Sequence, residues 1–197
     1  MKVIGIVGGM GAGKTTVVSL IKTFRNVFVI SGDQIGHAIL LKENEGYHQV
    51  VSAFGNAILS ESGDIERGRL GNIVFQDSKK LQRLNEITHP LIYKEVKRQV
   101  DLCRQEGFIE LVIIDAALLI EIGLVKLTDK IIAVYATDDV RLARTIERQG
   151  LSKEQVLERF KAQKKWEELR SIAHEIVDNS LSLEYTKNQI EDLMVRL

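Results

Sequence analysis

The sequence has little of what builds disulfides, zinc sites or proline-rich linkers. Its 197 residues include one cysteine, Cys103, and one proline, Pro90. A single cysteine excludes a disulfide within the chain and is typical of a reducing compartment. There is no zinc-ligand spacing, no Cys-x-x-Cys pair, no Ser-His-Asp order and no Gly-x-Gly-x-x-Gly followed by an acid. These absences argue against redox, zinc-dependent, triad-hydrolase and dinucleotide-binding proteins.

An excess of one charge and long apolar runs are also missing. Lys and Arg number 27, as do Asp and Glu, so the zero net charge gives no reason to expect a nucleic-acid or membrane partner. No apolar run reaches the roughly 18 residues of a membrane span, and no signal-peptide pattern follows Met1. With 45% apolar residues, we expect one cytoplasmic α/β domain, either a monomer or a weak homo-oligomer.

The glycine-rich run at residues 8–15, GGMGAGKT, carries the clearest chemistry. It follows an apolar strand pattern at residues 3–7 and precedes a helix pattern at residues 16–24, the context that a phosphate-binding P-loop requires. Glycines let successive backbone N–H groups turn toward an anion, and the helix N-terminus adds positive charge. We therefore expect ATP phosphates at the loop, held by Gly9, Gly11, Ala12, Gly13, Lys14, Thr15 and Thr16.

Two side chains of this motif have expected tasks of their own. Lys14 is predicted to reach the β- and γ-phosphates as a catalytic cation, and the Thr15 hydroxyl is predicted to bind Mg²⁺. The structural alternative is a simple glycine turn between a strand and a helix.

Short β-branched runs recur along the chain and alternate with helical patterns. This alternation predicts an α/β fold, a three-layer P-loop NTPase sandwich with a five-stranded parallel sheet and helices on both faces. The expected strands are residues 3–7, 27–30, 109–115, 130–136 and 175–177.

The gap between residues 30 and 109 is too long for one crossover and must hold a helical insertion. Helical patterns cover residues 33–43, 46–54, 67–75, 78–87 and 91–105, the last with Pro90 at its first position. A second, more basic helical stretch follows residue 140. We expect a core of residues 1–30, 107–140 and 171–197, an acceptor-binding insertion at 31–106 and a lid at 141–170. The alternative for the lid is a solvated helix pair.

The middle of the chain carries a more specific pattern than the P-loop. It contains AFG (53–55), GDIER (63–67), LGNIVF (70–75) and LNEITHP (84–90). These stretches resemble the dephospho-coenzyme A kinase family. The resemblance extends over essentially the whole chain, because it also includes residues 115–121, the pair Arg144 and Arg148, and IVDN (176–179). The resemblance implies ATP-dependent phosphorylation of the ribose 3′-hydroxyl of dephospho-CoA, the last step of coenzyme A synthesis.

Five positions depart from the family pattern. Ser31 stands where the family usually has the first Asp of an Asp-x-Asp element. Ala117 replaces a Pro, Arg141 a Gln, Lys165 a Pro and His174 an Asp. None of these changes removes a phosphate-handling group, so they bear on fine specificity and rate rather than on the reaction.

Two carboxylates follow expected strands. Asp33 lies after the second strand, at the sheet edge where open α/β folds bind ligands. The resemblance implies that Asp33 is catalytic and touches the acceptor, accepting the proton of the attacking hydroxyl. Its alternative is a first-turn acid behind a Ser31 cap, with Gln34 completing a capping box. Asp115 ends the third strand and is predicted to hold Mg²⁺, directly or through a water, or else to cap the following helix.

The resemblance implies that the acceptor is bound by Arg67, His89 and Leu118. Arg67 matches a family arginine and suits the pyrophosphate of dephospho-CoA, whereas Arg69 does not belong to the pattern. His89 precedes Pro90, so capping of the next helix is its alternative role.

Arg144 and Arg148 are four residues apart and therefore share one helix face. This spacing suits a lid that closes over ATP, with Arg144 catalytic as charge develops. The alternative is pairing with nearby glutamates such as Glu147. Asn179 resembles the family residue near the adenine and is predicted to bind ATP.

The P-loop is also compatible with other functions. Another small-molecule kinase of the same fold would act on a nucleotide or a sugar acid. Residues 33–36 match the Asp-x-x-Gly of GTP-binding switches, but they come too soon after the P-loop, and no Asn-Lys-x-Asp follows to read guanine. Zero net charge and the lack of a basic-aromatic surface pattern oppose a nucleic-acid-processing ATPase.

Overall fold

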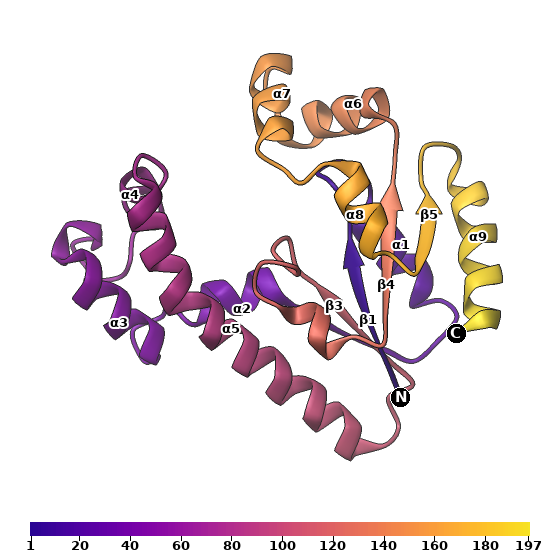
Figure 1. Ribbon diagram of the computed structural model, residues 1–197, viewed down its shortest axis with the longest axis horizontal. Coiled ribbons are helices and arrows are strands. Elements are labelled where there is room, and N and C mark those ends of the chain that lie inside the picture. The colour runs from indigo at the N-terminus through magenta and orange to yellow at the C-terminus, as the bar shows by residue number, and fades with distance from the viewer.

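The computed structural model describes all residues, 1–197, and places one sheet at the centre of the molecule (Figure 1). All strands are parallel and follow the order β2-β3-β1-β4-β5. They are β1 (Lys2–Val7), β2 (Val27–Ser31), β3 (Leu111–Asp115), β4 (Lys130–Tyr135) and β5 (Glu175–Asp178). The predicted five-stranded parallel sheet is confirmed, and each strand ends within two residues of its expected bounds.

Alternating side chains along each strand build two hydrophobic clusters, one on each face of the sheet. In β1, Val3 and Val7 belong to one cluster, whereas Ile4 and Ile6 belong to the other. The first is covered by α2 (Gly32–Ala38), α5 (Ser78–Glu106), η2 (Leu124–Leu127) and α8 (Trp166–Ile172), the second by α1 (Lys14–Ile21) and α9 (Leu183–Arg196). Helices on both faces confirm the predicted three-layer sandwich.

The last helix, α9, has no counterpart among the predicted helices. Its first turn is capped by Ser182, whose hydroxyl accepts a hydrogen bond from the N–H of Tyr185 (3.2 Å). Thr186, Ile190 and Leu193 are buried at helical spacing. The sequence signal for this helix is a serine cap followed by apolar residues at helical spacing, and this signal would have predicted α9.

The residues between β2 and β3 build a third, smaller hydrophobic cluster. They form α3 (Glu45–Phe54), η1 (Asn56–Ile58), α4 (Arg67–Val74) and the start of α5. The buried members of the cluster are Val50, Ile58, Leu70, Val74 and Ile87. In Figure 1, α3 and α4 lie at one end of the molecule, and α5 runs from them to the sheet. A helical insertion is therefore present, although α2 and the rest of α5 pack on the sheet itself.

The prediction of a helix break at Pro90 is wrong. The helices expected over residues 78–87 and 91–105 are one helix of 29 residues, α5, with Pro90 inside it. A proline within a helix removes one N–H and costs roughly 3 kcal/mol. Ile87 and Ile92 are buried on either side of Pro90, in different clusters, and this burial offsets the loss. His89 lies inside the helix, so its alternative role as a cap is excluded.

The predicted basic stretch after residue 140 forms three helices. α6 (Asp138–Gln149) and α7 (Lys153–Lys161) lie beyond the carboxyl ends of the strands, and α8 returns to the sheet (Figure 1). Ser152 and Gln155 form a reciprocal capping box that starts α7. Leu169 of α8 joins the first hydrophobic cluster, which attaches the end of this segment to the sheet. None of the helices is both long enough and apolar enough to cross a membrane.

Candidate active site

The P-loop joins β1 to α1 at the carboxyl edge of the sheet. Gly11 and Gly13 have φ angles of 78° and 93°, a region that residues with a side chain rarely adopt. A β-carbon at Gly13 would also lie 2.0 Å from Nδ2 of Asn179. Both the backbone shape and the close packing of the loop therefore require glycine, and α1 begins directly after it at Lys14.

Lys14 turns back toward the loop from the first turn of α1. Its Nζ donates a hydrogen bond to the carbonyl of Gly8 (2.7 Å). Burial lowers the pKa of Lys14, and the carboxylates of Asp115 and Asp33 oppose this shift because they favour the ammonium form. Lys14 is thus a desolvated cation whose positive charge an anion at the loop would stabilise.

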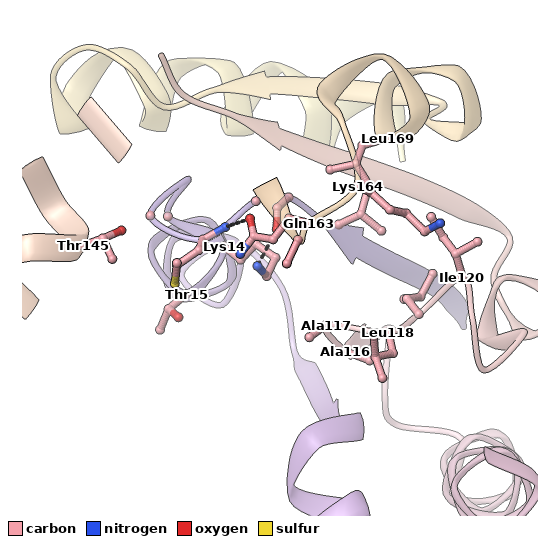
Figure 2. A pocket seen from close by; sticks show the side chains of 18 of the residues that line it. Lys14, Thr15, Ala116, Ala117, Leu118, Ile120, Thr145, Gln163, Lys164 and Leu169 are labelled. Carbon is pink, nitrogen blue, oxygen red and sulfur yellow. Dashed lines mark hydrogen bonds between the residues drawn. The ribbon is translucent and has the colours of Figure 1, made fainter. Parts of the chain in front are cut away.

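A cavity of about 860 Å³ opens beside the P-loop (Figure 2). Its walls come from the loop, the segment after β3, helix α6 and the α7–α8 connection. Of the predicted site residues, it is lined by Gly9, Gly11, Gly13, Lys14, Thr15, Thr16, Leu118, Arg144 and Arg148. Ala12 and Asn179, also predicted for ATP, do not line it because they are 0% and 3% exposed. Most of the predicted nucleotide-binding residues therefore surround one cavity.

Asn179 lies against the P-loop from the β5–α9 connection. Its Nδ2 donates to the carbonyl of Ala12 (2.8 Å), and its Oδ1 accepts from the hydroxyl of Thr186 (2.9 Å). The Asn179 carbonyl accepts from Nη1 of Arg144 (2.9 Å). Asn179 thus links α9, the P-loop and Arg144, which places it in a supporting position for the loop.

Arg144 and Arg148 reach the cavity from α6 without a carboxylate partner. Neither forms an ion pair, in contrast to Arg141 on the same helix, which pairs with Asp138 (2.8 Å). The alternative that these arginines pair with Glu147 is not observed. Two unpaired guanidinium groups beside a phosphate-binding loop form a site for an anion.

Asp33 contacts the segment that follows β3. Its Oδ1 accepts a hydrogen bond from the N–H of Ala117 (3.2 Å). The hydroxyl of Ser31 accepts from the N–H of Gln34 (3.2 Å), which confirms the predicted Ser31 cap. The Gln34 side chain does not bond back to Ser31, so the reciprocal capping box is absent. Asp33 makes no ion pair and leaves its other oxygen, Oδ2, without a partner.

Asp115 ends β3 and lies opposite Ser31 in the parallel register. Burial raises the pKa of Asp115, Lys14 lowers it, and the negative charge of Asp33 raises it further. Asp33 and Asp115 thus lie at neighbouring strand ends, and their charges act on Lys14, although neither carboxylate lines the cavity.

Arg67 lies outside the cavity, at the start of α4 in the insertion. Its side chain is exposed and has no ion-pair partner. Arg69, on the same helix, is held by Glu66 (2.6 Å) and by the carbonyl of Leu59 (2.6 Å). Arg67 is thus the free cation of this turn, but the structure does not bring it to the P-loop.

His89 lies in α5 and also outside the cavity lining. Its Nε2 is buried without a hydrogen-bond partner. Burial lowers the pKa of His89, and the nearby carboxylate of Glu121 raises it. Glu121 itself lines the cavity, whereas His89 does not.

Two residues that contact the P-loop, Gln163 and Arg141, are not predicted as site residues from the sequence. Gln163, in the α7–α8 connection, lines the cavity and bonds the N–H of Met10 in the P-loop (2.9 Å). In the sequence Arg141 differs from the family pattern, and in the structure its Nε donates to the carbonyl of Met10 (3.0 Å). The available signal was that Arg141 and Arg144 are three residues apart and share a helix face.

Two features define the class of protein. The strands are parallel in the order described above, and the P-loop opens into a cavity that is lined by arginines from a separate helical segment. The protein is a P-loop kinase. Comparisons with known proteins agree with this class and narrow it.

The family model described as dephospho-CoA kinase matches residues 2–184. The dephospho-CoA kinase of Aquifex aeolicus is 38% identical over 197 residues, which cover 100% of this chain and 98% of that relative. A solved structure from Thermus thermophilus aligns with a TM-score of 0.82 at 28% identity, covering 100% and 97% of the two chains. For a dephospho-CoA kinase from Campylobacter jejuni the TM-score is 0.71 at 25% identity, with 98% and 96% covered. The chain belongs to the dephospho-CoA kinase family, as the sequence motifs predict.

Proposed function

We propose that this chain transfers the γ-phosphoryl group of ATP to the ribose 3′-hydroxyl of dephospho-CoA, giving CoA and ADP in the last step of CoA synthesis. Membership of the dephospho-CoA kinase family supports the activity. The observation that carries the mechanism is the placement of Asp33 and Asp115 at the carboxyl ends of adjacent strands, where their charges act on Lys14 of the P-loop. A cation for the transferred phosphoryl group and two acids beside it are what this reaction requires.

On the donor side, the backbone N–H groups of the P-loop hold the phosphates of ATP. Lys14 neutralises charge on the oxygens being transferred, and Arg144 and Arg148 add positive charge from α6. Asn179 supports this half of the site through the carbonyl of Ala12. The segment of residues 141–170 acts as a lid, because it supplies cavity residues from α6, from the α7–α8 connection and from α8.

Mg²⁺ fits the residues of this site. No group of three or more His, Cys, Asp or Glu could hold a metal unaided. Mg²⁺ in nucleotide sites takes one or two protein oxygens, with phosphates and waters as the other ligands. The hydroxyl of Thr15 and the carboxylate of Asp115, directly or through a water, are the protein oxygens that would hold it. When bound, the ion would neutralise charge on the phosphates.

On the acceptor side, Asp33 is the base. Its Oδ1 is fixed by the N–H of Ala117, so Oδ2 is free to accept the proton of the 3′-hydroxyl as the new O–P bond forms. Arg67 and His89 of the insertion at residues 31–106, together with Leu118 of the segment after β3, hold the rest of the acceptor. We expect a cytoplasmic enzyme that is a monomer or a weak homo-oligomer.

The activity is tested by measuring ADP release from ATP with dephospho-CoA, AMP or shikimate as acceptor. We expect acceptor-dependent release with dephospho-CoA and little with the others. Faster release with AMP or shikimate would favour another small-molecule kinase of this fold. ATP hydrolysis that no acceptor accelerates would favour a regulatory NTPase.

Asp33→Asn should lower kcat by roughly 10² to 10⁴ while leaving ATP affinity nearly unchanged, the range expected for a general base. Asparagine keeps an oxygen that can accept the N–H of Ala117 but cannot take a proton. Asp139→Asn, which neutralises an exposed carboxylate on α6, is the matched control. A changed melting temperature with unchanged kcat would mean that Asp33 acts only at the start of α2.

Arg67→Ala should raise the KM for dephospho-CoA by about 10-fold or more and leave the KM for ATP unchanged, because one charge-assisted contact to the acceptor is lost. Arg69→Ala is the control, since that guanidinium is already bonded within the insertion. Steady-state kinetics with each substrate varied in turn measures the KM for dephospho-CoA and the KM for ATP separately. Equal rises in both KM values would remove Arg67 from the acceptor site.

A further inference from the structure

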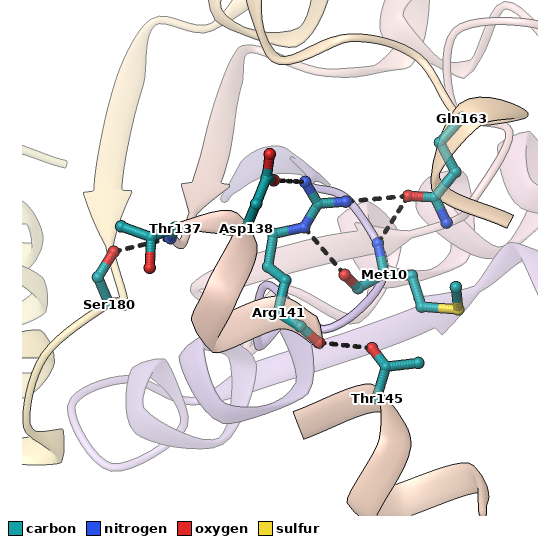
Figure 3. A network of polar contacts seen from close by, with 7 residues as sticks. All are labelled: Met10, Thr137, Asp138, Arg141, Thr145, Gln163 and Ser180. Atoms are coloured by element: carbon teal, nitrogen blue, oxygen red, sulfur yellow. Dashed lines mark hydrogen bonds and ion pairs between the residues drawn. The ribbon is translucent and has the colours of Figure 1, made fainter. Parts of the chain in front are cut away.

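Met10, in the middle of the P-loop, is held at both of its backbone polar groups by side chains of the lid segment (Figure 3). Its N–H donates to Oε1 of Gln163 (2.9 Å), and its carbonyl accepts from Nε of Arg141 (3.0 Å). A residue bonded in this way cannot rotate its peptide groups without breaking one of the two bonds.

Arg141 is fully occupied by contacts within the protein. Nη1 pairs with Asp138 (2.8 Å), Nη2 donates to Oε1 of Gln163 (3.3 Å), and the guanidinium lies 4.2 Å from the ring centre of Phe160. The side chain is only 17% exposed. All three nitrogens have protein partners, which distinguishes Arg141 from Arg144 and Arg148 and argues that it does not bind phosphate itself.

Arg141 also lies in close contact with two glycines of the loop. A β-carbon at Gly9 would lie 2.4 Å from Nη2 of Arg141, and one at Gly11 would lie 2.4 Å from the Arg141 carbonyl. That carbonyl accepts the hydroxyl of Thr145 (2.7 Å). Contact with the α6 backbone and a positive φ therefore require glycine at position 11, whereas a side chain at position 9 would displace the Arg141 guanidinium.

Gln163 joins the two parts of this network. One oxygen, Oε1, accepts both the N–H of Met10 and Nη2 of Arg141. Gln163 belongs to the α7–α8 connection, which forms a wall of the ATP cavity. If this connection moved away from the cavity, the Met10 N–H would lose its acceptor and Arg141 would lose one of its partners at the same time.

We infer that Arg141 and Gln163 are positioning residues that fix the path of the P-loop through Met10 and couple its shape to the placement of the lid. The inference rests on the proposed ATP-dependent activity for its kinetic consequence. Phosphate-binding loops act through preorganised N–H groups, and small misplacements of such groups cost one to two orders of magnitude in rate. The acceptor site is not part of the network.

Gln163→Met, which keeps the side-chain length and removes the acceptor oxygen, should lower kcat/KM for ATP by about 10- to 100-fold. The KM for dephospho-CoA should not change. Arg141→Lys should give a smaller loss in the same direction, because it keeps a cation and a donor but loses the fork of three contacts. Since both residues act on Met10, the double variant should lose little more than the more damaging single variant. Arg170→Ala, at an exposed position of the same segment, should match the wild type.

Hydrogen exchange of the Met10 amide in the ATP-free protein tests the inference independently of activity. Exchange should accelerate at least 10-fold in Gln163→Met and return toward the wild-type rate in Gln163→Glu, which restores an acceptor oxygen. Unchanged exchange at Met10, additive kinetic losses, or a lowered melting temperature with unchanged kcat/KM for ATP would each overturn it. If the wild type itself shows no transfer to dephospho-CoA, the proposed function fails, while the exchange result still decides this inference.

Discussion

Lys14→Ala is expected to abolish detectable phosphoryl transfer while leaving the protein folded. The ammonium neutralises charge on the oxygens being transferred, and no other side chain of the P-loop carries a positive charge. The fold should tolerate the change, because Lys14 bonds only the carbonyl of Gly8 and its burial disfavours the charged form. The measurements are kcat with saturating ATP and dephospho-CoA, and the melting temperature.

Lys22→Ala is the matched control for this prediction. Lys22 lies at the other end of α1 and is exposed, so its loss should alter neither kcat nor stability. If Lys14→Ala retained more than about a tenth of the wild-type kcat, the P-loop cation would not have the role proposed for it.

Arg144→Ala should depress kcat by about 10³-fold or more, with smaller effects on both KM values. Its Nη1 is bonded to the carbonyl of Asn179, which aims the group, while the absence of a carboxylate partner leaves its charge uncompensated. Such a cation stabilises charge that is fully developed only in the closed, reacting complex.

Arg144→Lys and Arg170→Ala separate the possible outcomes for Arg144. The lysine variant keeps the charge but loses the planar fork, so it should recover only part of the rate. Arg170→Ala removes an exposed arginine from the same segment and should leave kcat unchanged. A loss below tenfold in Arg144→Ala would identify residues 141–170 as a solvated helical segment without a catalytic arginine.

The sequence signals for the proposed donor half of the site are local. A strand, a glycine loop and a helix are adjacent in the chain, so the spacing of Gly8 to Thr15 already contains the geometry of the P-loop. The strands could be located for a similar reason, since buried parallel strands are short β-branched runs bounded by helices. The meeting of Asp33 with Asp115 follows from the parallel order of β2 and β3.

The features that the sequence does not predict depend on contacts between distant segments. Pro90 favours a helix start when read locally, and only the burial of Ile87 and Ile92 in two clusters makes α5 continuous. Gln163 lies 153 residues from its partner Met10, and no spacing rule connects two such positions. Asn179 carried a signal from resemblance alone, and its contact with Ala12 required the folded chain.

The separate hydrophobic cluster of the insertion bears on how a chain of this kind can diverge. Its buried residues are shared with neither cluster of the sheet, and α5 is the helix that runs through both regions. Substitutions in contact with each other must compensate one another, whereas distant ones act independently. The part of the molecule proposed to recognise the acceptor can therefore accumulate changes one at a time, while the P-loop, enclosed by Asn179 on one side and Arg141 on the other, can change only in concert with its neighbours.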